Sequence, residues 1–173
     1  MQQYIDSIHL YPEDGNVHHW SIAPTRARNR PETPVNDSAM NAYAALLLRL
    51  SLGAMFVAHA LLKYFVFTLP GTVQFFESLG LPGFLGYVTV AVEFVGGLML
   101  IAGVGARAAS IVLIPILIGA TWAHSGNGWL FSSPKGGWEF PAFWTVTLLV
   151  QALLGDGAFA LRRSGGTPAF QRA

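Results

Sequence analysis

Four long apolar stretches, separated by short polar segments, are the feature that most constrains how this chain folds. They run over about residues 42–67, 84–102, 107–124 and 140–161. Each has roughly 18–26 residues, and an α-helix needs about 20 to cross the hydrocarbon of a bilayer. Backbone groups in lipid must be hydrogen-bonded within their own segment, which favours helices, and the alternating polarity of membrane strands is not seen. The sequence therefore predicts an all-α membrane protein, an antiparallel bundle of four transmembrane helices.

The composition supports this fold class and excludes several functions. Hydrophobic residues make up 53% of the chain and charged residues 11%, whereas a soluble domain has about 25% charged residues. Disorder is excluded because it requires low hydrophobicity and high charge. The net charge of +1 excludes a strongly basic nucleic-acid-binding protein. The absence of cysteine excludes disulfides, a dithiol redox pair, a cysteine-ligated cluster and covalently attached c-type haem.

The distribution of charge divides the chain into three parts. Residues 1–40 form a hydrophilic, largely irregular tail, residues 41–161 form the transmembrane domain, and residues 162–173 form a second tail. Lys and Arg collect on the cytoplasmic side of membrane proteins. Seven arginines fall on one side of an up-and-down bundle, namely Arg26, Arg28, Arg30, Arg107, Arg162, Arg163 and Arg172. We therefore expect both tails, and so both termini, to be cytoplasmic.

The two loops on the opposite, outer side are the longer ones. In residues 68–83 an apolar side chain recurs every third position between two prolines, which predicts a short interfacial helix. Residues 125–139 carry Trp129 and Trp138 among Gly and Ser. Because Trp prefers the headgroup region, we expect this second loop to lie on the membrane surface.

Ionisable residues in or beside the apolar stretches are the candidate functional groups. Charged side chains in a membrane are costly and usually face the interior of a bundle. The residues concerned are Arg49, His59, Lys63, Glu93, His124 and Glu139. A rise of 1.5 Å per residue puts all of them except Arg49 in the outer half of the bilayer. His59 and Lys63 are four residues apart, so they share a helical face, and the small residues of that stripe predict contact with the second apolar stretch.

Each of these residues also has a structural interpretation. Lys63 and Arg49 are long enough to extend to the headgroups. His124 and Glu139 are ordinary residues for a membrane interface. A carboxylate as deep as Glu93 must be protonated or paired, and His59 or Lys63 is the available partner. A structural ion pair therefore stays open beside a functional site.

Three kinds of bound group were compared for these residues. In a quinone or quinol pocket, a His or a carboxylate hydrogen-bonds a quinone oxygen and carries its proton, while Phe and Trp enclose the ring. A b-type haem needs His59 and His124, whose depths differ by about 10 Å. Zinc or copper on His59, His124 and Glu139 lacks a tight ligand spacing. The sequence therefore favours quinone as the cofactor over haem or a metal.

A series of residues between about positions 43 and 160 carries a family resemblance. They are Arg49, Leu50, Gly53, Phe56, His59, Lys63, Phe76, Gly80, Leu81, Pro82, Glu93, Gly96, Gly97, Gly103, Arg107, His124, Gly136, Gly137, Trp138 and Glu139. In this combination the chain resembles the DoxX family of small four-helix membrane proteins, although Ala60 stands where that family usually has Gly. The resemblance implies a bacterial inner (plasma) membrane protein. Some relatives are linked to thiosulfate:quinone oxidoreduction or to a quinol oxidase, and others act with partner proteins.

The sequence thus predicts a redox-linked membrane subunit that interacts with quinone or quinol in the outer half of the bilayer. The candidate catalytic residues are His59 and Glu93, one or the other of which relays protons, and Lys63, which stabilises a quinone anion or an anionic donor such as thiosulfate. The candidate cofactor-binding residues are His59, Glu93, His124, Glu139 and Arg49. Two alternatives remain: a non-enzymatic membrane subunit or scaffold of a larger complex, and a transporter of a small solute.

Overall fold

The computed structural model describes residues 37–162, and all of its regular elements are helices. They are α1 (Asp37–Phe65), α2 (Leu69–Ser78), α3 (Phe84–Ala102), α4 (Ala106–His124), the short 3₁₀ helix η2 (Ser125–Asn127) and α5 (Glu139–Leu154). The all-α fold class predicted from the sequence is confirmed. Most of both predicted tails, with five of the seven arginines used to orient the chain, lies outside the described residues.

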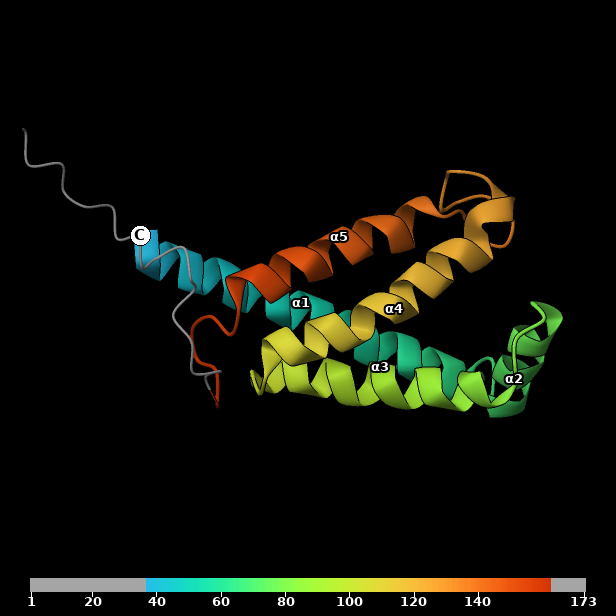
Figure 1. The fold of residues 1–173 in the computed structure, drawn as a ribbon, viewed down its shortest axis with the longest axis horizontal. Coiled ribbons are helices and arrows are strands. Elements are labelled where there is room, and N and C mark those ends of the chain that lie inside the picture. The colour runs from blue at the N-terminus through green and yellow to red at the C-terminus, as the bar shows by residue number, and fades with distance from the viewer. Residues whose placement is uncertain (1–36, 163–173) are drawn as a thin grey trace, which may run out of the picture. The chain divides into compact units, whose positions relative to one another are not determined.

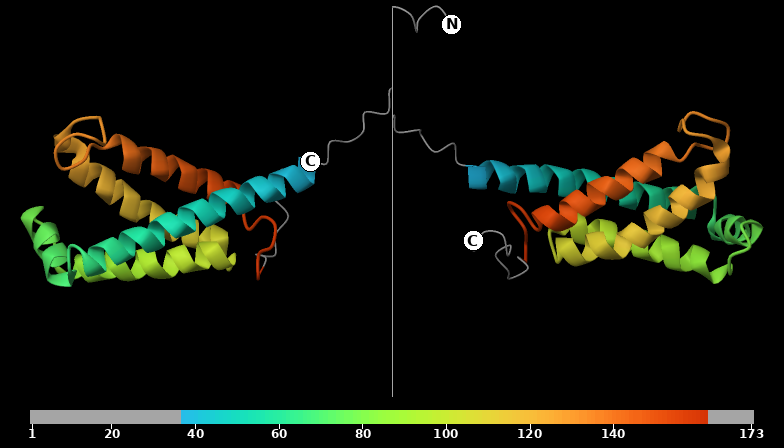
Figure 2. Two further views of the ribbon diagram at one scale, coloured as in Figure 1. Left: turned by 180° about the vertical axis from the view of Figure 1, so that it is seen from behind. Right: turned by 45° about the horizontal axis from the view of Figure 1, so that its top comes forward.

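The helices pack as two neighbouring pairs. Helix α1 lies beside α3, and α4 lies beside α5, in all the views of Figures 1 and 2. The close approach of α1 to α3 depends on glycine, because a Cβ added to Gly53 would lie 2.7 Å from the Gly97 carbonyl oxygen. Gly96 faces α4 instead, where an added Cβ would lie 3.0 Å from the Leu113 side chain. The predicted contact between the first and second apolar stretches is therefore confirmed.

The helix lengths and surfaces are those of a membrane protein. Helices α1, α3 and α4 with η2 are long and apolar enough to cross a bilayer, and α5, with 16 residues, is apolar but shorter. The core between the helices contains Leu52, Phe56, Leu100, Leu113 and Leu148, each at most 3% exposed. Many other large apolar side chains are exposed on the described helices, as lipid-facing positions require.

The first two helices occupy nearly the expected residues. Helix α1 begins at Asp37, earlier than the predicted start at about residue 42, with an acidic residue in its first turn as the helix dipole favours. Helix α2 forms within the predicted outer loop. Its N-cap is Thr68, whose side chain accepts a hydrogen bond from the Gly71 N–H at 3.3 Å, and Pro70 lies in its first turn, where no N–H is needed.

Helix α5 ends before the end of the apolar stretch that contains it, so it is shorter than the sequence predicts. The stretch continues to residue 161, but the helix ends at Leu154. Gly155 and Gly157 have φ values of 81° and 70°, which glycine adopts without the strain of a side chain. The following chain then returns to α1, where the Ala158 N–H donates to the Ala42 carbonyl oxygen at 2.9 Å. Local glycine conformation and this tertiary contact thus override hydropathy.

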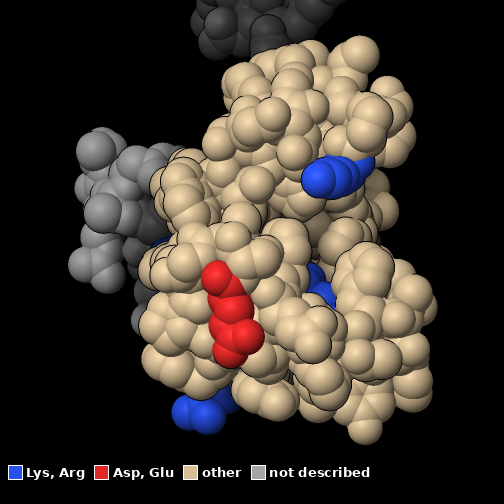
Figure 3. Space-filling model, turned by 90° about the vertical axis from the view of Figure 1, so that its right-hand side faces the viewer, with Lys and Arg blue, Asp and Glu red and all other residues tan. Residues whose placement is uncertain are grey.

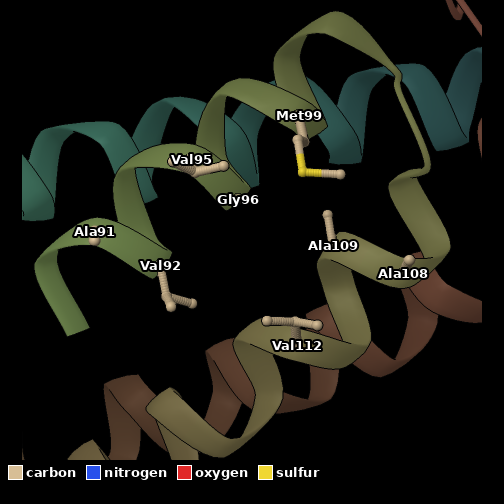
Figure 4. A pocket seen from close by; sticks show the side chains of 8 residues that line it. All are labelled: Ala91, Val92, Val95, Gly96, Met99, Ala108, Ala109 and Val112. Carbon is tan, nitrogen blue, oxygen red and sulfur yellow. The ribbon is translucent and has the colours of Figure 1, made fainter. Parts of the chain in front are cut away.

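An apolar groove of about 340 Å³ runs between α3 and α4 (Figure 4). It is lined by Ala91, Val92, Val95, Gly96, Met99, Ala108, Ala109 and Val112. Several of these residues are small, so the two helices do not fill the space between them. None of the lining side chains is polar.

Candidate functional site

Lys63 and Glu93 form an ion pair between α1 and α3. Lys63 Nζ donates to both Glu93 carboxylate oxygens, at 2.7 and 2.9 Å. Glu93 is 5% exposed, whereas the side chain of Lys63 is 21% exposed, so the pair is open on its lysine side. Figure 3 looks onto the end of the molecule that carries α2, where most of the described surface is uncharged and one basic side chain lies recessed in a hollow. Of the two partners that the sequence left open for Glu93, the structure pairs it with Lys63.

His59 lies one helical turn before Lys63 and joins this pair to a group of aromatic rings. Its Nδ1 is 2.9 Å from the Met55 carbonyl oxygen. Its ring centre is 4.9 Å from that of Trp144, and the two rings meet edge to face. His59 also lies within electrostatic range of the Glu93 carboxylate. The structure therefore brings together all three predicted catalytic residues.

The aromatic rings come mainly from the start of α5. Phe140 and Trp144 are four residues apart and share one helical face. Phe140 lies 6.4 Å from His59 and 5.5 Å from Trp144, which stacks at 4.5 Å on Phe56 of α1. We call Phe56, His59, Phe140 and Trp144 the ring cluster. The sequence predicts Phe and Trp around a quinone without indicating which ones, although the helical spacing of Phe140 and Trp144 just after Glu139 is a usable signal.

His124 and Glu139 fasten the loop between α4 and α5. Glu139 Oε1 accepts a hydrogen bond from the Phe131 N–H at 2.8 Å. His124 Nδ1 is 3.1 and 3.2 Å from the carbonyl oxygens of Lys135 and Gly136. Because a carbonyl oxygen only accepts, Nδ1 is the donor in these bonds. Asn127 Nδ2 also lies 3.3 Å from His124 Nδ1. The described contacts of both residues are thus with the segment between α4 and α5, and their part in cofactor binding stays a prediction.

Arg49 lies far from the ion pair, 14 residues or about 21 Å earlier along α1. It is 1% exposed, and its Nη2 donates to the Ala158 carbonyl oxygen at 3.2 Å. Its guanidinium interacts electrostatically with Asp156 and fills the space beside Gly103, where an added Cβ would overlap with it. Arg49 therefore joins α1 to the α3–α4 turn and to the chain after α5. Its predicted part in cofactor binding also stays a prediction.

Comparisons with known proteins identify the family. The DoxX family model matches residues 44–126. A protein of Bacillus subtilis (strain 168) named "Putative oxidoreductase CatD" is 41% identical over 116 residues, which cover 67% of this chain and 82% of the relative. The chain belongs to the DoxX family. No solved structure matches it significantly.

The DoxX match includes only part of the candidate site. Lys63, Glu93 and His59 lie within the matched residues, whereas Phe140 and Trp144 of α5 follow them. The ion pair and the histidine are therefore on the segment that defines the family. Phe56 of the ring cluster also lies within the match, whereas Phe140 and Trp144 come from a helix outside it.

The polar side chains of the site are able to form hydrogen bonds and to transfer protons. It contains an ammonium group, a carboxylate and an imidazole, with the ring cluster beside them. Within residues 37–162, no group of three or more His, Cys, Asp or Glu is arranged to hold a metal ion. Imidazole and carboxylate are the side chains that most often move protons in enzymes.

Proposed function

We propose that this DoxX protein is a redox-linked membrane subunit that binds quinone or quinol beside the Lys63–Glu93 pair. The observation that carries the proposal is a nearly buried carboxylate that is paired to a partly exposed lysine. A histidine lies one helical turn from this lysine, and two aromatic side chains contact the histidine. Charged groups inside a membrane bundle usually mark a functional path or site. The name of the Bacillus subtilis relative, an oxidoreductase, agrees with this assignment.

Each residue has a distinct part in this proposal. His59 accepts a proton from a quinol hydroxyl, and Glu93 accepts it in turn or tunes the histidine by its charge. Lys63 stabilises the negative charge of a deprotonated quinol or of an anionic donor such as thiosulfate. Phe140 provides the face on which a quinone ring stacks. The electrons pass to or from partner redox subunits, as in thiosulfate:quinone oxidoreductase or quinol oxidase complexes.

The proposal includes a topology. We propose that α1, α3, α4 and α5 all cross the bacterial plasma membrane, that α2 lies at the outer interface, and that both termini are cytoplasmic. The ion pair then lies in the outer half of the bilayer. Because the natural chain has no cysteine, single cysteines at Ser78 and Ser164 test it without further changes. An impermeant maleimide added to whole cells is expected to label S78C and not S164C, and the reverse result contradicts the topology.

Quinone retention tests the binding site. Protein purified gently from its native membrane is expected to carry ubiquinone or menaquinone, detected by mass spectrometry. Glu93→Gln and His59→Ala are expected to lose it, whereas Glu77→Gln, which changes an exposed carboxylate on α2, retains it. Stable wild-type protein that neither binds quinone nor turns over quinol contradicts the proposal.

A non-enzymatic membrane subunit or scaffold is the second candidate. It is favoured by the geometry of the ion pair, since Lys63 bridges α1 to α3 and satisfies both oxygens of Glu93. Thermal unfolding in detergent distinguishes the two functions. If Glu93→Gln and His59→Ala unfold the protein, the polar groups serve packing. If both variants stay folded and lose quinone, the scaffold alone does not explain the site.

A further inference from the structure

Two hydrogen-bonding groups of the ring cluster have no partner in the described part of the chain. One is Nε2 of His59, for which no hydrogen bond is formed within residues 37–162. The other is Nε1 of Trp144, a buried indole nitrogen without an acceptor in the same range. The two rings are neighbours, with centres 4.9 Å apart and planes inclined at 60°. Their unpaired groups are of opposite kinds.

The hydrogen bond on the other side of the imidazole fixes His59 Nε2 as an acceptor. The Met55 carbonyl oxygen, 2.9 Å from Nδ1, only accepts, so Nδ1 carries the proton. In the neutral ring Nε2 is then unprotonated and presents a lone pair. The helix backbone thus selects the tautomer, as the second partner of a functional histidine usually does.

Trp144 Nε1 is only a donor. Trp144 is 5% exposed, and a buried donor without an acceptor destabilises the folded state. Tryptophan in a membrane protein usually avoids this cost by placing its N–H in the polar interface. Its N–H, on a ring that contacts His59, is therefore available to an oxygen atom that residues 37–162 do not supply.

We infer that His59 Nε2 and Trp144 Nε1 together recognise one hydroxyl group of a hydroquinone, so that the site prefers quinol to quinone. This inference rests on the proposed function and adds the redox form that is bound and the residue, Trp144, that helps to select it. A quinol hydroxyl donates to His59 and accepts from Trp144 at the same time. A quinone carbonyl accepts from Trp144 but offers nothing to the His59 lone pair.

Access to the buried indole nitrogen requires a side chain to move. Phe140 is the most exposed member of the ring cluster, at 39%. It stands 5.5 Å from Trp144 and 6.4 Å from His59, against both residues. Phe140 is therefore the side chain that we expect to rotate when a ligand ring enters the cluster.

Binding of decylubiquinol and decylubiquinone to the full chain in nanodiscs tests the inference. For the wild-type protein, the dissociation constant is expected to be roughly three- to tenfold lower for the quinol, the value of one hydrogen bond. Trp144→Phe keeps a ring but removes the N–H, so it is expected to weaken both ligands by a similar factor. His59→Phe, which keeps the ring that His59→Ala removes, is expected to weaken quinol more than quinone and abolish the preference, and His59→Gln, which restores an acceptor, to recover part of it. Trp122→Phe, at an exposed tryptophan of α4, is the matched control without effect.

The outcomes separate this inference from the proposed function. If the wild-type protein binds neither ligand, the proposed function itself fails. If it binds both ligands equally, or if Trp144→Phe leaves both affinities unchanged, quinone binding stands and the hydroxyl recognition is wrong. The wild-type comparison needs no substitution, so it remains decisive even if a variant does not fold.

Discussion

Removing Lys63 gives the sharpest test of the energetics of the ion pair. In Lys63→Met, Glu93 loses the donor of both of its hydrogen bonds while it remains 5% exposed. Breaking a buried pair by removing one partner costs about 3–5 kcal/mol. Because the Lys63 side chain is 21% exposed and a lone carboxyl group is able to take up a proton, we expect about 3 kcal/mol, the lower end of that range.

The opposite substitution is expected to cost less. In Glu93→Gln the lysine keeps its charge, but its flexible chain reaches from the open side of the pair toward the headgroups. We expect a loss of about 1 kcal/mol for this variant. The double variant K63M/E93Q removes both charges, so its stability is expected to return to within about 1 kcal/mol of the wild type.

The free energy of unfolding is measured by titration with SDS in mixed micelles, followed by tryptophan fluorescence. Lys135→Met and Glu77→Gln remove exposed charges of the same types and are expected to change stability by less than about 0.5 kcal/mol. A coupling energy near zero between positions 63 and 93 would refute the reasoning, since it means that neither charge depends on the other.

Two glycine contacts give the remaining predictions. Gly103→Ala is expected to destabilise the protein by roughly 2–4 kcal/mol, because its φ is 67° and the new Cβ would overlap with the buried Arg49 guanidinium. Gly119→Ala, in α4 with open space around it, is the control and is expected to be neutral or stabilising by up to about 1 kcal/mol; equal effects of the two variants contradict the Arg49 contact. Gly53→Val is expected to push α1 away from the Gly97 carbonyl oxygen and to lower the free energy of unfolding by about 3 kcal/mol. The same SDS titration measures this change, and an unchanged midpoint contradicts the described helix packing.

The sequence predicts helices and helix contacts correctly where a single physical effect determines them. Burial of apolar groups in lipid predicts α3 and α4 almost to the residue. The stripe containing Gly53 predicts the face of α1 that meets α3, because close backbone approach requires small side chains. Hydropathy alone failed at the end of α5, where Gly155 and Gly157 stop the helix inside an apolar stretch.

The sequence predicts which residues form the candidate site, but not which of them bind one another. Periodicity puts His59 and Lys63 on one face, and depth puts Glu93 at a similar level, so the group itself follows from helical geometry. Which base binds the carboxylate depends on side-chain reach, and the longer lysine does so. The contact of Trp144 with His59 depends on how α5 lies against α1, and the spacing of residues within one helix does not encode it.

The two buried charged regions differ in what a ligand is able to reach. Arg49 is enclosed at 1% exposure by the α3–α4 turn and the chain after α5, so any ligand would first have to separate those segments. Lys63, in contrast, is open at 21% exposure of its side chain. Between the two regions lie Leu52 and Phe56, with at most 3% exposure, which offer no polar path along α1. A charge in an apolar helix is therefore an ambiguous signal by itself, and here enclosure of Arg49 favours a structural role while incomplete enclosure of Lys63 favours binding.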